Sequence, residues 1–164
     1  MSDTQEMRMP QPTEEHELLL KSVGTWDVAG KFWMEGPGSD PMATTGTEVV
    51  TALGGFWITS VYTSEFFGMP FEGHCGATYD TIKQQYVTTW RDSMSSTLFH
   101  MTGQMEGDTL TCTGIAPDCQ SGADAMHRTV ESGIGTDTRV FAMYMTPPGG
   151  EEIQMMELTY TRKS

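Results

Sequence analysis

The sequence predicts an all-β protein: an antiparallel up-and-down barrel of about ten strands with a short N-terminal helix at one end. Three observations lead to this fold class. Segments of about 6 to 11 residues rich in Thr, Val, Tyr, Phe and Trp recur along the chain. Short turns rich in Gly, Pro and Asp separate these segments, which favours antiparallel hairpins between neighbours. A meander of this length must close on itself or split into two sheets, so a β-sandwich is the alternative.

The polar stretch at residues 1–12 contains two prolines and is interpreted as a flexible tail. A short helix is expected directly after it. Thr13 is a typical N-cap, glutamates follow in the first turn, and Gly24 is expected to end the helix. Residues 13–164 are interpreted as a single barrel domain with strands at 26–33, 47–53, 56–66, 71–79, 85–92, 97–104, 109–115, 125–131, 138–145 and 153–162.

The charge balance excludes some classes of partner. The chain carries 22 Asp and Glu against 9 Lys and Arg, a formal net charge of −13. This excess of acid argues against nucleic acid and against an anionic membrane surface as partners. The sequence shows no secretory signal and no segment approaching the ~20 apolar residues of a membrane-spanning helix. We therefore expect a soluble, cytoplasmic protein with reduced thiols at Cys75, Cys112 and Cys119.

The pattern of histidines and cysteines does not indicate a metal site. No two of the four histidines have HxH or HExxH spacing, and the adjacent His74 and Cys75 would point to opposite faces of a strand. The sequence also lacks a CxxC pair, a GxSxG nucleophile motif and a Gly-rich phosphate loop before a helix. We therefore expect neither a metal nor a cofactor.

Alternation within the predicted strands favours a barrel with a cavity. In the strand at 56–66 neither face is cleanly polar, which is typical of a barrel interior that need not be dry. The 14 methionines either fill irregular gaps in the core or line an adaptable apolar pocket. The expected wall of this cavity is mostly aromatic, with Asp92 or His100 as a polar anchor; its other members are Trp33, Trp57, Tyr62, Trp90, Phe99, Met143 and Tyr160.

An ordered set of short motifs resembles an uncharacterised bacterial family, the domain of unknown function fifteen seventy-nine. The set runs from about residue 13 to the C-terminus, and no single piece of it is specific. The resemblance implies the fold and no activity. The main pieces are Glu15-His16, Gly24-Thr25-Trp26, Gly54-Gly55-Phe56, Phe71-Glu72-Gly73, Tyr79-Asp80, Trp90 with Asp92, and Thr159-Tyr160-Thr161-Arg162-Lys163.

The chain is also similar, more loosely, to lipocalin-like barrels. These begin with a short helix and a Gly-x-Trp in the first strand, and a basic residue near the end covers the Trp. Gly24-Thr25-Trp26 and Arg162 fit this pattern here. The resemblance implies that Trp26 and Arg162 touch and close one end of the barrel, a cation–π contact that contributes about 0.5–2 kcal/mol. His16 is expected in the helix that plugs the same end.

Several functions remain open at this point. The leading hypothesis is non-enzymatic binding of a small apolar or amphipathic molecule inside the barrel. The alternatives are an isomerase or hydrolase that uses Asp92 and His100, and a structural protein that forms a homodimer. A haem site is also weighed, because nitrobindin-like barrels have ten strands. The resemblance to them implies an iron-binding His in the last strand, and residues 153–162 contain none.

Overall fold

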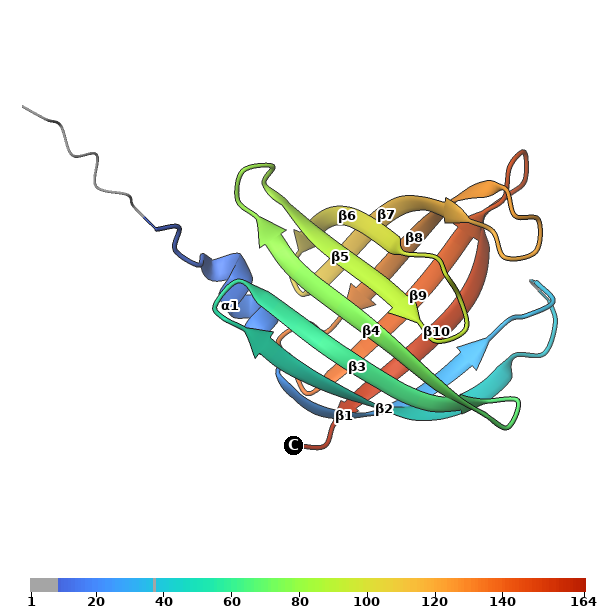
Figure 1. The fold of residues 1–164 in the computed structure, drawn as a ribbon, viewed down its shortest axis with the longest axis horizontal. Coiled ribbons are helices and arrows are strands. Elements are labelled where there is room, and N and C mark those ends of the chain that lie inside the picture. Colours follow the sequence, from blue (N-terminus) through green and yellow to red (C-terminus); the bar gives the residue numbers. More distant parts are fainter. Residues whose placement is uncertain (1–8, 37) are drawn as a thin grey trace, which may run out of the picture.

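The computed structural model describes residues 9–36 and 38–164, which form one helix and ten antiparallel strands closed into a barrel (Figure 1). Each strand pairs with its neighbours in sequence, and β10 pairs with β1 to close the sheet. The predicted up-and-down barrel is therefore confirmed, and the alternative of a sandwich is wrong. The elements are α1 (Glu14–Leu20), β1 (Gly24–Phe32), β2 (Met42–Leu53), β3 (Trp57–Phe66), β4 (Met69–Asp80), β5 (Gln85–Asp92), β6 (Phe99–Glu106), β7 (Thr109–Pro117), β8 (Asp124–Ser132), β9 (Thr138–Thr146) and β10 (Ile153–Arg162).

The ends of some strands differ from the prediction. β2 begins at Met42 rather than at Thr47, because its first residues continue the ladder with β1 as far as the pair of Phe32 and Met42. Gly24 was expected to end the helix, but it begins β1 instead. Its φ is +143°, and a Cβ there would lie 2.4 Å from the backbone oxygen of Ser164. Only glycine fits this close approach of the two chain segments.

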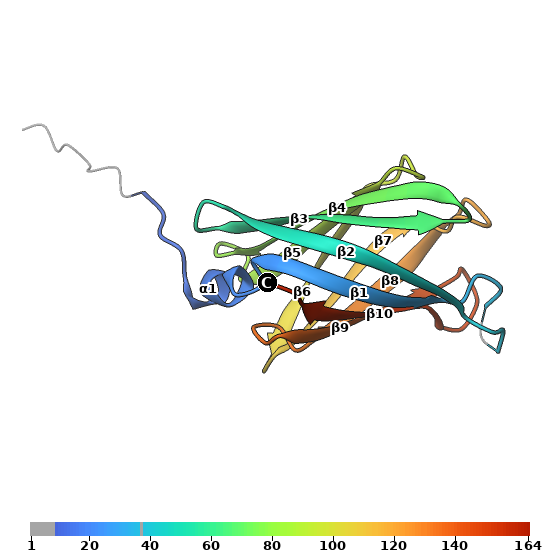
Figure 2. The same ribbon diagram turned by 90° about the horizontal axis from the view of Figure 1, so that it is seen from below.

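Helix α1 lies against one end of the barrel, close to the C-terminus of the chain (Figures 1 and 2). Thr13 is its N-cap, as predicted, and the backbone N–H of Thr13 donates to Nδ1 of His16 at 2.9 Å. The buried face of the helix consists of His16 and Leu19, and the helix contacts β3 and β4. Leu19 joins a buried cluster that includes Tyr86, Met101, Leu110, Cys112 and Ile134.

The buried residues of the interior form two clusters, of which the first includes Leu19 of α1. A second buried cluster contacts the first through Ile58 and contains Trp26, Val28, Val50, Tyr62, Leu158 and Tyr160. All of these residues occupy inward-facing positions, since side chains alternate along each strand. The register brings Trp26 opposite Glu48 of β2 and opposite Arg162 of β10.

Part of the expected flexible tail at 1–12 cannot be compared with the structure, because residues 1–8 lie outside the described residues. Residues 9–12 precede α1 without regular secondary structure. Within the described part of the chain, no helix is both long and apolar enough to cross a membrane.

Candidate functional site

Three charged side chains meet inside the barrel. Arg139 of β9 donates through Nη2 to Oε2 of Glu48 at 2.7 Å and through Nη1 to Oε1 of Glu131. Ser60 donates to the other oxygen of Glu48 at 2.7 Å. Arg139 and Glu48 keep 7% and 9% of their side-chain surface exposed, whereas Glu131 keeps 22%. We call Glu48, Glu131 and Arg139 the charged triad; it joins strands β2, β8 and β9 across the interior.

Aromatic rings hold the guanidinium of the triad in place. Arg139 Cζ lies 4.2 Å from the ring centroid of Trp26 and 4.4 Å from that of Tyr160. Each contact of this kind is attractive, and more so away from water. Arg139 is thus fixed by two carboxylates and by two rings, which leaves it little freedom to turn toward a new partner.

Burial and charge act against each other on the pKa values of the triad. Burial raises the pKa of Glu131 above its ordinary value, although the attraction of Arg139 opposes the change. Burial also lowers the pKa of Arg139, but the attraction of Glu131 and Glu48 outweighs it, so that its pKa is raised overall. Two carboxylates and one guanidinium carry a formal net charge of −1 when all are ionised. The triad therefore favours an added positive charge, which can be a proton on Glu131.

Two further inward groups stay protonated at neutral pH. Burial, followed by the charges of Glu48 and Glu131, raises the pKa of the Cys75 thiol to about 12. Burial likewise raises the pKa of Tyr160 well above its ordinary value. Since the thiolate is the reactive form of cysteine, Cys75 is not a nucleophile here. Both groups act as polar but uncharged parts of the interior.

Trp26 and Arg162 close the end of the barrel next to α1. Trp26 is 0% exposed, and its indole Nε1 donates to the backbone oxygen of Ser22 at 2.9 Å. Arg162 Cζ lies 4.3 Å from the Trp26 ring centroid, so the contact expected from the sequence is present. The same guanidinium donates to the backbone oxygens of Lys21 at 2.6 Å and Val23 at 2.9 Å. These bonds tie the last strand to the segment that leaves α1.

His16 belongs to the same closed end. It is 1% exposed, and its ring meets the rings of Phe56 and Tyr79 edge-on, with centroids 5.1 and 6.0 Å away. Its Nδ1 accepts the backbone N–H of Thr13. His16 is therefore buried because it caps the start of α1 and packs against two aromatic rings.

The half of the barrel away from α1 is lined by aromatic rings that contact one another. Phe32 lies 5.0 Å from Phe66, Phe66 lies 5.2 Å from Phe71, and Phe71 lies 6.4 Å from Trp90, all between ring centroids. Tyr62 joins them at 6.0 Å from Phe71. We call these five residues the aromatic belt. It runs over β1, β3, β4 and β5 and gives this half of the barrel a continuous apolar wall.

Trp90 is held in the belt by its neighbours. Its Nε1 donates to Oδ2 of Asp92 at 2.9 Å. Its ring lies over Gly73, where a Cβ would come within 2.1 Å of the indole. Because Gly73 has no side chain, the Trp90 ring can lie flat along the inner wall. Asp92 holds the indole N–H of Trp90 near the open end of the barrel.

Inward-facing side chains are less buried in the half of the barrel away from α1 than at the closed end. At the closed end the inward residues are buried, as Trp26 at 0%, Val28 at 3% and Val50 at 3% show. In the open half, several large inward side chains are only half-buried: Phe32, Phe66, Phe71, Trp90, Phe99, Phe141, Met143 and Met156. Accessible surface on the inner wall requires free space beside it. Glu131, an inward residue of β8, also keeps 22% of its side-chain surface accessible.

Some buried polar atoms of the interior are unsatisfied. The Tyr62 hydroxyl and the Thr88 hydroxyl have no hydrogen-bond partner among the residues that the structure describes. Tyr62 is 4% exposed, so bulk water does not solvate it. Leaving such a group unpaired costs about 1–3 kcal/mol, so both hydroxyls favour a polar molecule inside the barrel.

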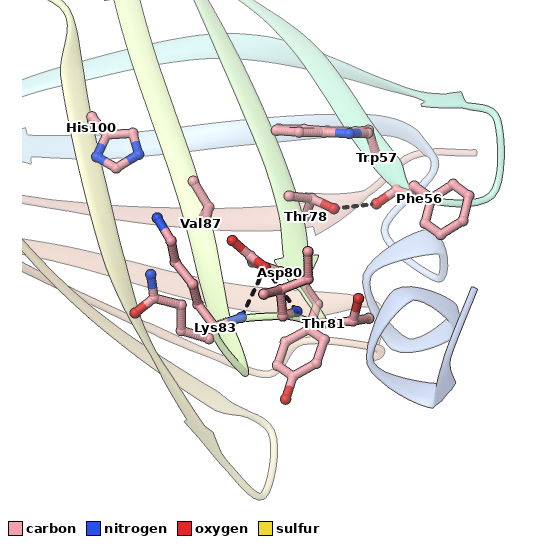
Figure 3. Close-up of a pocket in the computed structure, with 11 residues that line it drawn as sticks. Phe56, Trp57, Thr78, Asp80, Thr81, Lys83, Val87 and His100 are labelled. Carbon is pink, nitrogen blue, oxygen red and sulfur yellow. Dashed lines mark hydrogen bonds between the residues drawn. The ribbon is translucent and has the colours of Figure 1, made fainter. Parts of the chain in front are cut away.

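The predicted wall residues fall into two groups in the structure. Most of them occupy inward positions, but Trp57 and His100 lie on outward positions of β3 and β6 and line a hollow of about 390 Å³ on the outer surface (Figure 3). Trp33 follows the end of β1, where its backbone N–H donates to Met155. The inward residues are Tyr62, Trp90, Asp92, Phe99, Met143 and Tyr160.

The two polar anchors expected from the sequence do not lie together. Asp92 lines a hollow of about 580 Å³ near the β5–β6 connection, whereas His100 lines the hollow beside the β4–β5 turn. In Figure 3 the labelled His100 lies at the edge of that outer hollow, together with Val87 and Trp57. This separation removes the geometric basis for a catalytic pair of Asp92 and His100.

The sequence-based reasoning missed the charged triad. None of its three residues, Glu48, Glu131 and Arg139, is among the site residues expected from the sequence. A signal was present, because Arg139 shares the parity of Phe141, Met143 and Met145 in a strand whose inward face is otherwise apolar. A charge at such a position predicts a buried partner.

The structure also bears on metal binding. Among the residues that it describes, no group of three or more His, Cys, Asp or Glu side chains is arranged to hold a metal ion. His127 points inward from β8, and its Nδ1 donates to the backbone oxygen of Ala125 at 3.1 Å. Burial lowers the pKa of His127. It packs edge-on against Phe99 at 5.1 Å.

Comparisons with known proteins agree with the barrel fold. The crystal structure of Rv2717c from M. tuberculosis superimposes with a TM-score of 0.66 at 11% identity, over 94% of this chain and 100% of that one. A redesigned β-barrel gives a TM-score of 0.47 at 12% identity, over 92% and 96% of the two chains. No curated protein matches the sequence. The model of the family described as protein of unknown function (DUF1579) matches residues 11–162, and the chain therefore belongs to this family.

Proposed function

We propose that the barrel binds a small apolar or amphipathic molecule in its open half. The observation that carries this proposal is the accessible surface on inward-facing side chains such as Trp90, Phe99 and Met143. A barrel of this size can hold one small ligand when side chains do not fill it. The closed end, by contrast, has no room for a ligand, because Trp26 and its neighbours are buried.

The chemistry of the inner wall supports the same class of ligand. The aromatic belt offers flat apolar surface, and Met143 and Met156 add flexible side chains that adapt to different shapes. Asp92 at the mouth and the Tyr62 hydroxyl deeper inside are polar groups within this apolar wall. A few polar groups in an apolar cavity are typical of sites that orient an amphipathic molecule.

Apolar side chains also surround the entrance. The connections at the open end expose Met34 at 52%, Phe67 at 72%, Met69 at 52%, Met94 at 47% and Leu98 at 59%. Met34, Phe67, Met94 and Leu98 belong to the β1–β2, β3–β4 and β5–β6 connections, and Met69 is the first residue of β4. An apolar rim lowers the cost of moving an apolar molecule from its carrier or membrane into the barrel.

The experiment that tests the proposal uses the neutral dye Nile red and a pair of matched variants. Ser64 points into the open half of the barrel and the adjacent Thr63 points outward, since Ser64 pairs with Phe71 and Thr63 with Glu72. Ser64→Phe fills the interior, whereas Thr63→Phe adds the same ring to the outer surface. We expect saturable dye binding by the wild type and by Thr63→Phe, and at least tenfold weaker binding by Ser64→Phe.

The same measurement can contradict the proposal. Wild-type protein that does not bind Nile red, or binds it equally well after Ser64→Phe, would show that the interior is not a ligand site. Circular dichroism of both variants checks that each one is folded.

A further inference from the structure

The interior of the barrel contains more acidic than basic side chains. Its charged groups are Glu48 and Glu131 with Arg139 in the triad, and Asp92 at the mouth. With all of them ionised, three carboxylates stand against one guanidinium. His127 adds no compensating positive charge at neutral pH, because burial lowers its pKa. An anionic ligand would therefore meet a negative interior on a protein whose formal net charge is already −13.

The guanidinium is not free to receive an acidic head group. Nη1 and Nη2 of Arg139 are both engaged by carboxylates, and its flat face lies against Trp26 and Tyr160. Its Nε has no partner, but Arg139 keeps only 7% of its side-chain surface exposed. A carboxylate of a fatty acid would have to displace Glu48 or Glu131 to reach it.

Glu131 is the member of the triad that a ligand can reach. It keeps 22% of its side-chain surface accessible, against 9% for Glu48. Arg139 binds one of its oxygens, and no residue that the structure describes donates a hydrogen bond to the second. The buried, unpartnered hydroxyl of Tyr62, which is 4% exposed, is a second polar group that lacks a partner on the inner wall.

We infer that the ligand of the barrel carries a cationic, hydrogen-bond-donating head group, such as a protonated amine, which binds Glu131, while its apolar tail lies along the aromatic belt. This inference rests on the proposed ligand-binding function and names the class of ligand. A protonated amine supplies the positive charge that the triad lacks and donates up to three hydrogen bonds. The direction in which the pKa of Glu131 is shifted agrees with it, because a site that holds a proton on a carboxylate favours positive charge there.

The test compares three amphiphiles with the same tail: decylamine, 1-decanol and decanoate. Each is titrated against the protein with bound Nile red, near neutral pH, where the amine is protonated and decanoate is ionised. We expect decylamine to displace the dye on the order of tenfold more tightly than 1-decanol, and decanoate to be weaker than 1-decanol. The neutral alcohol reports on the cavity alone, and the two charged compounds report on the head-group site.

A pair of variants locates the effect. Glu131→Gln removes the accessible interior carboxylate, and Glu157→Gln makes the same change of charge at an outward position of β10, opposite Lys31. We expect the advantage of decylamine over 1-decanol to vanish in Glu131→Gln and to persist in Glu157→Gln. If Glu131→Gln does not fold, the selectivity of the wild type still decides the question.

The outcomes separate this inference from the proposed function. If 1-decanol displaces the dye but decylamine has no advantage, or decanoate binds best, the assignment of a cationic ligand is overturned and the cavity remains. If the wild type binds neither Nile red nor any of the three compounds, both the cavity and the cationic ligand are overturned. If the advantage of decylamine is unchanged in Glu131→Gln, the amine does not bind where we infer.

Discussion

The two ends of the barrel have the same alternating strands but bury their inward side chains differently. At the closed end α1 covers the opening, Trp26 is 0% exposed, and its indole N–H is paired with Ser22. At the open end no helix in the described part of the chain covers the belt, and Phe66 and Trp90 remain half-buried. The burial of inward side chains therefore changes along the barrel axis. We expect the closed end to contribute most of the stability, and our proposal places ligand binding in the open half.

The charged triad lies between these two regions. Arg139 belongs to the closed end through its contact with Trp26, whereas Glu131 keeps more of its side-chain surface accessible. Under the proposed function, Glu131 has both a structural role in the triad and a role in ligand binding. We therefore expect substitutions at the closed end, in the triad and in the belt to change the free energy of unfolding by different amounts and for different physical reasons.

The largest expected effect comes from removing the ring at the centre of the closed end. Trp26→Ala should lower the free energy of unfolding by about 5 kcal/mol, because it leaves a large cavity and removes the ring that Arg139 and Arg162 contact. Phe66→Ala in the half-buried belt should cost only about 1–2 kcal/mol. Denaturation in urea, followed by circular dichroism, measures both. Equal losses of unfolding free energy in the two variants would show that both ends contribute equally to stability. That result would contradict our expectation that the closed end contributes more.

A second large effect is expected from the triad itself. Arg139→Met keeps the length of the side chain but leaves Glu48 and Glu131 without their counter-charge, which should cost about 3–5 kcal/mol. The matched control is Arg128→Met on the outer surface, where the ion pair with Glu152 has side chains 33% and 40% exposed. That change should cost less than about 1 kcal/mol, because solvent screens the pair. A small loss for Arg139→Met would mean that the triad contributes little net stability.

Much of the closed end could be predicted from the sequence, because its signals are local. Thr13 and the glutamates after it mark the start of α1, and Gly24-Thr25-Trp26 with Arg162 marks the contact between the first and last strands. Turn residues separate the strands and predict their number, whereas the choice between a barrel and a sandwich needed the structure. These features depend on neighbours in sequence, or on a recognisable motif at each end of the chain.

The interior could be predicted only in part. In β3 both Trp57 and Ile58 are apolar, so the sequence does not show which of them points inward; the structure places Ile58 inside and Trp57 at 37% exposed on the outer surface. For the same reason the sequence did not show which side of β6 His100 faces, and its predicted place in the cavity was wrong. The triad was missed for another reason. Glu48 and Arg139 are 91 positions apart, and their meeting depends on how the closed sheet brings β2 and β9 together across the interior, which no local pattern records.

The smallest expected effect is the pH dependence of stability that Glu131 introduces at the boundary of the two ends. In the folded barrel burial raises the pKa of Glu131 above its ordinary value of 4.5, so the folded state keeps this proton at pH values where the unfolded chain has lost it. The stability that the proton contributes is therefore present in full below about pH 4.5 and is lost as the pH rises through the raised pKa.

Glu131→Gln keeps the shape of the side chain and cannot titrate, so its stability relative to the wild type should increase as the pH rises across this window. Urea denaturation of both proteins at a series of pH values measures the difference, and Glu157→Gln on the outer face of β10 is the control, for which we expect a much smaller change with pH. A difference between Glu131→Gln and the wild type that stays constant with pH would show that folding does not raise the pKa of Glu131.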